Sequence, residues 1–223
     1  MDKESLVKNY HDVLDEVKKY SGGRDVSLLI ATKQQTTEDI NCLVEAGACL
    51  IGENKVNELL EKYEGYDKRA EVHFIGTLQS NKVKYIVDKV SLIHSVYKVS
   101  QLEEISKRAG AIGKVMDILI EVNSGKEENK GGLFPEDVSE FCTLARSFPS
   151  IRVRGLMTMA PKCQSREEYL KYFGLTKELF DKLFGDEEGA ILSMGMSDSY
   201  TYAIEAGATL VRVGSKIFGE RKY

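Results

Sequence analysis

The sequence contains little of what secreted, membrane-spanning or zinc-binding proteins require. Its four cysteines are scattered without a C-x-x-C pair, and its three histidines show no ligand spacing, so we expect neither disulfides nor a metal site. No apolar run approaches the ~18 residues of a membrane-spanning helix. The N-terminal segment is charged and amphipathic, unlike a signal peptide. We therefore expect a reduced, cytoplasmic protein.

An excess of charge of one sign is also missing. The 31 lysine and arginine residues are nearly balanced by 35 aspartate and glutamate residues. This balance predicts no nucleic-acid partner and no binding to an anionic membrane surface. Only three prolines occur, and no Ser/Gly-rich linker divides the chain. We therefore expect residues 1–223 to form a single domain.

What the chain does contain is a series of short runs rich in Val, Ile and Leu. Because the runs are continuous rather than alternating, they predict strands that are buried on both faces, as in a parallel sheet. The expected strands are Val26–Ala31, Cys49–Ile51, Val72–Ile75, Ser91–His94, Val115–Val122, Val153–Met157, Ile191–Ser193 and Leu210–Val213.

Segments with helical periodicity separate these strands. The expected helices are Thr37–Glu45, Val56–Tyr63, Gln79–Val87, Gln101–Arg108, Glu136–Arg146, Glu167–Phe184 and Asp198–Glu205, and a further helix, Lys3–Tyr20, precedes the first strand. Units of roughly 28 residues favour a single (β/α)₈ TIM-type barrel with an extra N-terminal helix that covers one side. A doubly wound open sheet is the alternative, but no G-x-G-x-x-G follows the first strand.

Lys33 follows the first expected strand, at the end of a barrel where active sites lie. Partial desolvation there disfavours the ammonium form and lowers the pKa, and a neutral amine is what Schiff-base chemistry requires. The alternative is a lysine that extends to solvent or pairs with a carboxylate.

Two glycine turns follow the seventh and eighth strands, where barrels commonly bind phosphate. Gly195 and Gly214 permit close approach of an anion, and the hydroxyl groups of Ser197 and Ser215 can add hydrogen bonds. Ser197 or Asp198 is the expected N-cap of the helix that follows. Ordinary glycine turns without a ligand are the alternative.

Arg212 lies inside an apolar strand, where an unpaired guanidinium is costly. Glu53 is one candidate partner, and the ring nitrogen of a bound cofactor is another. His73 and His94 are expected to be core histidines with one hydrogen bond each, and Cys49 a buried packing residue.

The segment after the third strand carries Gln79, Asn81 and Lys82. These side chains are suited to a substrate, a partner or a secondary cofactor site. They are equally typical of a polar helix start, and the sequence does not decide between these roles.

Several of these segments occur together in an order known from one family. They are Lys33, Gly52-Glu-Asn, His73-Phe-Ile-Gly-Thr-Leu-Gln-Ser-Asn-Lys, Arg154-Gly-Leu-Met-Thr-Met, Ser193-Met-Gly-Met-Ser and Val211-Arg-Val-Gly-Ser-Lys-Ile-Phe-Gly. In this combination the chain resembles the YggS/PROSC family of pyridoxal phosphate homeostasis proteins, which are similar to the N-terminal barrel domain of alanine racemase. Departures at Gln34 and Ser199 leave the aldimine and phosphate positions intact.

The resemblance implies a pyridoxal 5′-phosphate site. Lys33 matches the lysine that forms an aldimine with the cofactor, and Arg212 matches the arginine that faces the pyridine nitrogen. The phosphate-binding positions are matched by Ser197, Gly214 and Ser215. Asn54 lies near the cofactor in the family's Gly-Glu-Asn motif.

The expected role is cofactor buffering and delivery, with apoenzymes that depend on pyridoxal phosphate as recipients and a monomeric state. An arginine beside the pyridine nitrogen disfavours its protonation, so carbanion chemistry is weakly supported. A racemase also needs a second proton-transfer group from an added β-domain, for which the chain leaves no room after Tyr223. We therefore assign no catalytic residue.

Two alternatives remain. A pyridoxal-dependent amino-acid racemase with weak activity is the first, in which Tyr200 or Tyr202 would reach the barrel mouth. An aldolase-like barrel that uses Lys33 on sugar phosphates is the second, and it predicts no bound chromophore.

Overall fold

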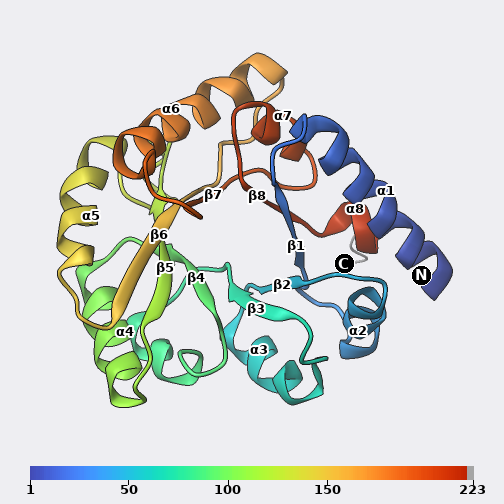
Figure 1. The fold of residues 1–223 in the computed structure, drawn as a ribbon, viewed down its shortest axis with the longest axis horizontal. Coiled ribbons are helices and arrows are strands. Elements are labelled where there is room, and N and C mark those ends of the chain that lie inside the picture. Colours follow the sequence, from blue (N-terminus) through green and yellow to red (C-terminus); the bar gives the residue numbers. More distant parts are fainter. Residues whose placement is uncertain (220–223) are drawn as a thin grey trace.

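The computed structural model describes residues 1–219 and forms a closed barrel of parallel strands with helices on the outside (Figure 1). Each strand pairs with its neighbours in the sequence, and β8 pairs back with β1 to close the ring. The predicted (β/α)₈ barrel is therefore confirmed, and the open doubly wound sheet is wrong.

The eight strands lie where the apolar runs predict them, with ends that differ by a few residues. They are β1 Ser27–Ala31, β2 Leu50–Glu53, β3 Glu71–Phe74, β4 Leu92–Val96, β5 Met116–Val122, β6 Ile151–Thr158, β7 Ile191–Ser193 and β8 Leu210–Val213. Their outward side chains and the inner faces of the helices make one large apolar core.

The helices cover the barrel in the expected order. They are α1 Lys3–Ser21, α2 Thr37–Glu45, α3 Val56–Lys62, α4 Val99–Ala111, α5 Val138–Arg146, α6 Arg166–Phe184, α7 Tyr200–Glu205 and α8 Ser215–Phe218, with 3₁₀ turns η1 Tyr63–Gly65, η2 Ser80–Tyr85 and η3 Pro135–Asp137. The expected helix Gln79–Val87 is thus a 3₁₀ turn, and the helix expected from Asp198 begins only at Tyr200.

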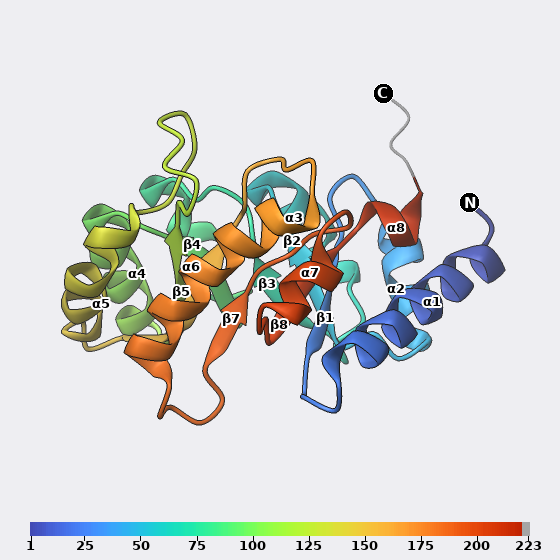
Figure 2. The same ribbon diagram turned by 90° about the horizontal axis from the view of Figure 1, so that it is seen from above.

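Helix α1 lies outside the barrel beside α8, as Figure 2 shows, and also packs against α7 and α2. The amide of Asn9 donates to the carbonyl of Ile217 in α8 over 3.0 Å. The side chain of Glu16 accepts hydrogen bonds from Tyr200 and Lys216. The N-terminal helix therefore supports the two helices that follow β7 and β8.

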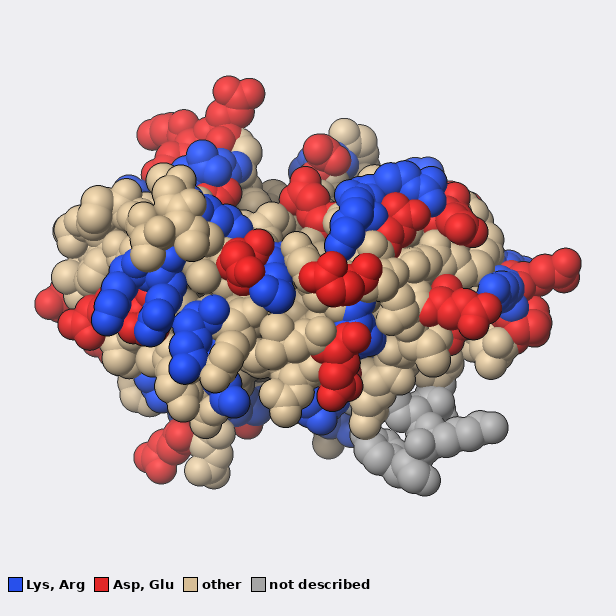
Figure 3. Space-filling view, turned by 90° about the horizontal axis from the view of Figure 1, so that it is seen from below, with Lys and Arg blue, Asp and Glu red and all other residues tan. Residues whose placement is uncertain are grey.

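On the face shown in Figure 3, acidic and basic side chains are interspersed, and neither charge sign dominates the surface. No helix among residues 1–219 combines the length and the apolar composition that a membrane crossing needs. Across the same residues, no cluster of His, Cys, Asp and Glu side chains is suited to a metal ion.

Candidate ligand-binding site at the barrel mouth

Lys33 lies in the turn just after β1 and is half-buried. Together with Asn54, Gly76 and Glu121 it lines a cavity of about 300 Å³ at the mouth of the barrel. The fold thus brings the predicted Lys33 and Asn54 into one cavity. A Cβ on Gly76 would lie 1.9 Å from the carbonyl oxygen of Asn54, so only glycine allows this close approach.

The turn that bears Lys33 is fixed by a buried carboxylate. Oε1 of Glu53 accepts from Thr32 Oγ1 over 2.6 Å and from the hydroxyl of Tyr66 over 2.5 Å. The ammonium of Lys62 lies 2.6 Å from the same oxygen and 3.2 Å from the carbonyl of Thr32. Glu53 therefore pairs with Lys62, and the proposed Glu53–Arg212 pair is wrong, because α3 supplies a closer cation.

A second carboxylate fixes the residue after Lys33. Gln34 has a φ of 63°, which is uncommon for a residue other than glycine. Its N–H donates to Oε2 of Glu58 over 2.8 Å. Burial raises the pKa of Glu58, but this hydrogen bond and the charge of Lys62 outweigh it and bring the pKa below its ordinary value. An ionised Glu58 thus stabilises the unusual backbone beside Lys33.

The turns after β7 and β8 are joined by one hydrogen bond, which Ser197 Oγ accepts from the N–H of Gly214 over 3.2 Å. Gly195 has a φ of +91°, and a Cβ there would lie 2.5 Å from that of Ala203. A Cβ on Gly214 would lie 2.9 Å from the carbonyl oxygen of Ala31. Glycine at this position therefore lets the β8 turn pack against the end of β1, close to Lys33.

Backbone donors remain free in these turns. Within residues 1–219, no acceptor is present for the N–H groups of Ser197, Asp198, Ser215 and Lys216. Ser215 is exposed at the start of α8. Free N–H groups at glycine turns are the usual cradle for an anion.

The expected N-cap is not where the sequence placed it. Ser199, rather than Ser197 or Asp198, occupies the N-cap position of α7, and its hydroxyl accepts from the N–H of Met196. The hydroxyl of Ser197 is committed to Gly214 instead. Ser197 therefore ties the two turns together.

Arg212 points into the barrel and is only 4% exposed. Its guanidinium donates to Ser193 Oγ over 2.5 Å and to the carbonyl of Thr158 over 3.0 Å. Ser193 Oγ lies 3.1 Å from Nδ1 of His94, whose Nε2 lies 3.1 Å from Nδ1 of His73. His94 thus makes two hydrogen bonds rather than the expected one, because His73 and Ser193 both lie beside its ring in the barrel interior.

Burial strongly shifts the pKa values of the ionisable side chains in this interior. Burial lowers the pKa of Arg212 to about 10, and the nearby charge of Glu121 opposes the shift. Burial, aided by the charges of His73 and Arg212, lowers the pKa of His94 well below 6.5. Near neutral pH, therefore, Arg212 is charged and His94 is neutral.

Glu121 is a residue of the cavity that sequence reasoning missed. It lies on the interior face of β5 and is only 4% exposed. Burial raises its pKa to about 7, against the lowering effect of the Arg212 charge. The signal in the sequence was a glutamate near the carboxyl end of an otherwise apolar strand.

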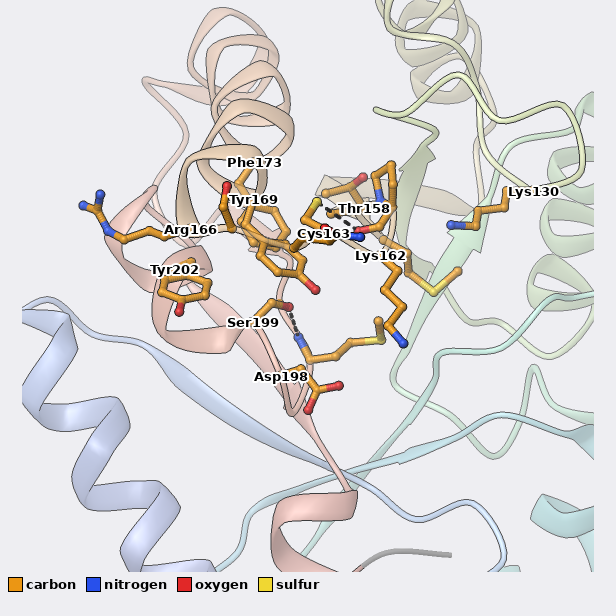
Figure 4. A pocket seen from close by; sticks show the side chains of 17 residues that line it. Lys130, Thr158, Lys162, Cys163, Arg166, Tyr169, Phe173, Asp198, Ser199 and Tyr202 are labelled. Atoms are coloured by element: carbon orange, nitrogen blue, oxygen red, sulfur yellow. Dashed lines mark hydrogen bonds between the residues drawn. The ribbon is translucent and has the colours of Figure 1, made fainter. Parts of the chain in front are cut away.

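A larger cavity of about 640 Å³ adjoins the first, with Met159 on the boundary of both. In Figure 4 the rings of Tyr169 and Phe173 lie on one side of it and Lys130 lies on the other. Tyr202 lines this cavity and stacks on Tyr169 at 5.8 Å between ring centroids.

Other candidates from the sequence lie elsewhere. The hydroxyl of Tyr200 bonds to Glu16 and Lys216 against α1, so the expectation that Tyr200 reaches the mouth is wrong. Lys82 lies in η2 with its ammonium 5.6 Å from the ring centre of Tyr85, outside the cavity of Lys33. Cys49 is exposed just before β2 rather than buried.

The alanine racemase N-terminal domain family matches residues 9–222 of this chain. A pyridoxal phosphate homeostasis protein of Aquifex aeolicus is 45% identical over 205 residues, or 91% of this chain and 90% of the relative. The chain belongs to the family of pyridoxal phosphate homeostasis proteins. A family member from Helicobacter pylori is 33% identical over 204 residues, with 90% of each chain covered. The family resemblance of the motifs is thereby confirmed.

Solved structures agree with this family assignment. PipY of Synechococcus elongatus, solved with pyridoxal phosphate bound, is 26% identical with a TM-score of 0.84, covering 96% of this chain and 100% of PipY. A protein of unknown function from Bifidobacterium adolescentis is 30% identical with a TM-score of 0.91, covering 98% and 97%. An alanine racemase of Clostridium difficile is 16% identical with a TM-score of 0.78; the match covers 99% of this chain and 57% of the racemase, and it shows the fold alone.

Proposed function

We propose that this protein binds pyridoxal 5′-phosphate at the barrel mouth, with the aldehyde joined to Lys33 as a Schiff base, and takes part in homeostasis of the cofactor. The observation that carries the proposal is the pairing of β1 with β8. It brings the turn of Lys33 beside the turn of Gly214, where backbone N–H groups are free. An amine and an anion cradle at one rim match a ligand with an aldehyde and a phosphate.

The remaining side chains also fit this ligand. Arg212 is charged and lies inside the barrel below the mouth, suited to face a ring nitrogen as an N–H donor. Asn54 lines the same cavity as Lys33 and supplies an amide. Ser197, Gly214 and Ser215 belong to the turns that offer free N–H groups. We assign these residues the roles that the family resemblance implies.

Storage and delivery fit the site better than rapid catalysis. Pyridoxal phosphate supplies an aldehyde and an electron-accepting ring, and the ring accepts electrons best when its nitrogen is protonated. A charged Arg212 opposes that protonation. Tyr200, one candidate for a second proton-transfer group, faces α1 instead of the mouth. These features favour a carrier over an amino-acid racemase.

The first experiment is the absorption spectrum of the protein with pyridoxal phosphate, before and after borohydride reduction. We expect a yellow band that borohydride abolishes, with the pyridoxyl mass on the Lys33 peptide. Lys33→Ala is expected to lose both, and Lys82→Ala, which changes a lysine outside the cavity, is expected to keep both. An equal yield of the reduced adduct from Lys33→Ala would overturn the proposal.

A second experiment tests delivery. The loaded protein is mixed with an apoenzyme that depends on pyridoxal phosphate, and the recipient's activity is followed over time. Transfer that is faster than release into buffer with a trap for the free aldehyde indicates delivery by contact. Transfer at the release rate would leave buffering as the role.

Chiral analysis separates the racemase alternative. The loaded protein is incubated with L-alanine or L-serine, and the D-isomer is measured. Racemisation at ordinary enzyme rates of ~1–10³ s⁻¹ would replace the carrier proposal with the enzyme. A protein that stays colourless with excess pyridoxal phosphate would favour the aldolase-like alternative, and sugar phosphates would then be tested.

A further inference from the structure

Two glutamates are buried near Lys33, and they differ in their partners. Glu53 is fully buried, and its Oε1 receives three donors. Glu121 is 4% exposed, yet within residues 1–219 its carboxyl group has no hydrogen-bond or ion-pair partner. Among residues 1–219, the buried side-chain oxygens without a hydrogen-bond partner belong to Glu53 and Glu127, so the carboxyl group of Glu121 is open to the cavity that it lines.

The direction of the Glu121 side chain indicates what that role concerns. Glu121 lines the cavity of about 300 Å³ together with Lys33 and Asn54. Side chains alternate along a strand, so Glu121 shares the interior face of β5 with Leu119. Its carboxyl group therefore opens into the space where a ligand joined to Lys33 would have its reacting end.

Burial and the charged groups around Glu121 together set the pKa of its carboxyl group. Arg212 on β8 acts on it from the barrel interior, and Lys33 and Lys55 line the same cavity from the turns after β1 and β2. Burial raises the pKa of Glu121 to about 7, so both its protonated and its ionised forms are populated near neutral pH. A group of this kind is suited to general acid–base catalysis.

We propose that Glu121 is the acid–base residue for forming and breaking the bond between Lys33 and an aldehyde ligand. This inference rests on the proposed function. In the forward direction the carboxylate of Glu121 takes a proton from the ammonium of Lys33. The amine lone pair then bonds to the aldehyde carbon, and a proton moves from nitrogen to the former aldehyde oxygen.

The carboxylic acid of Glu121 next returns its proton to the new hydroxyl group. That hydroxyl leaves as water while the C=N bond forms, and Glu121 becomes a carboxylate again. One ammonium and one aldehyde thus give one protonated C=N linkage and one water, with no change of oxidation state. Release is the reverse reaction, in which Glu121 helps water to add.

The test compares wild type with Glu121→Gln, which keeps the shape and removes the titratable group. Release of pyridoxal phosphate from the loaded protein into a trap, and reloading of the emptied protein, are each followed by absorbance from pH 5.5 to 9. We expect both rates to fall by about 10²-fold or more in Glu121→Gln. Because a catalyst accelerates both directions, the binding equilibrium should change far less than either rate.

The pH profile supplies a second readout. Wild type should show an inflection near the pKa of Glu121, Glu121→Asp should retain an inflection, and Glu121→Gln should lose it. Asp117→Asn is the matched control, since Asp117 lies at the opposite end of β5 and pairs with Arg152. It should behave like wild type.

Three results would overturn the inference. The first is equal rates for wild type and Glu121→Gln. The second is a change in one rate alone, matched by an equal loss of affinity. The last is a wild-type pH profile without an inflection. The last applies even if Glu121→Gln fails to fold. The Schiff base itself is judged separately from Lys33→Ala, so a failure of the Glu121 inference and a failure of the proposed function remain distinct.

Discussion

Nδ1 of His73 lies 3.1 Å from Nε2 of His94 inside the barrel, and this histidine pair continues through Ser193 to Arg212. A guanidinium can only donate, so Ser193 Oγ accepts from Arg212. Nδ1 of His94 lies 3.1 Å from the same oxygen. Because burial lowers the pKa of His94, the ring is neutral near neutral pH, and one of its nitrogens donates while the other accepts.

Replacing Ser193 should break this chain at its centre. Ser193→Ala leaves an N–H of Arg212 and Nδ1 of His94 buried without their partner. We expect the free energy of unfolding to fall by about 1–3 kcal/mol, as measured by urea denaturation. Ser147→Ala, at an exposed helix end, is the control and should change it by no more than about 0.5 kcal/mol. Equal effects of the two variants would contradict the role of Ser193.

The neutral state of His94 predicts how stability depends on pH. Below its ordinary pKa of 6.5, the unfolded chain binds a proton at His94 that the folded state does not. The free energy of unfolding should therefore decrease as the pH falls through that value, by at most about 1.4 kcal/mol per unit from this one group.

His94→Gln should remove this part of the pH dependence while keeping a donor and an acceptor at the position. Urea denaturation at pH 7.5 and pH 5.5 measures the difference between the variant and wild type. If His94→Gln loses as much stability on acidification as wild type does, His94 is not the group responsible.

The ion pair of Lys62 and Glu53 should be costly to break from one side. Lys62→Met leaves the fully buried Glu53 carboxylate without its cation, which we expect to cost about 3–5 kcal/mol of unfolding free energy. Ligand affinity should fall as well, because Lys62 also binds the carbonyl of Thr32 beside Lys33.

Thermal denaturation and titration with pyridoxal phosphate measure the two effects of Lys62→Met. The double variant Lys62→Met/Glu53→Gln should recover part of the stability, since no charge is then left unpaired. Lys8→Met removes an exposed ion pair with Asp12 and should change little. A double variant as unstable as Lys62→Met would contradict the explanation.

Gly76 should tolerate no side chain. In Gly76→Ala the added Cβ would lie 1.9 Å from the carbonyl oxygen of Asn54, so the backbone must shift. We expect about 1–3 kcal/mol of destabilisation and weaker ligand binding, because both residues line the cavity of Lys33. Gly174→Ala is the matched control: it has open space inside α6 and should raise stability by up to about 1 kcal/mol. Gly76→Ala with wild-type affinity and stability would refute this prediction.

The fold was predictable because its signals are local. Each strand is a continuous apolar run, and even the short β7, Ile191–Ser193, lies where that run places it. The positions of Lys33 and Gly214 were predictable too, since strand ends at one rim of a barrel carry the site. The sequence does not indicate which of several chemically suitable partners a charged or hydroxyl side chain contacts in the folded protein.

Two errors illustrate this limit. Glu53 and Arg212 are both buried ions, but Lys62 approaches Glu53 from α3, and Arg212 uses a hydroxyl and a carbonyl oxygen instead. Ser197 is a good N-cap residue type, yet its hydroxyl bonds to Gly214 in the next turn. Each outcome depends on contacts between segments that are distant in the sequence.

The closure of the barrel has a consequence for the newly made chain. Lys33 follows the first strand, but the turn of Gly214 beside it follows the last strand, β8, and α1 packs against the late helices α7 and α8 as well as against α2. Domains generally fold as units during synthesis, so a single closed barrel is completed only when its last strand is available. A nascent chain on the ribosome therefore lacks the Gly214 turn beside Lys33 until β8 has been made, and a ligand that needs both turns could bind only after that point.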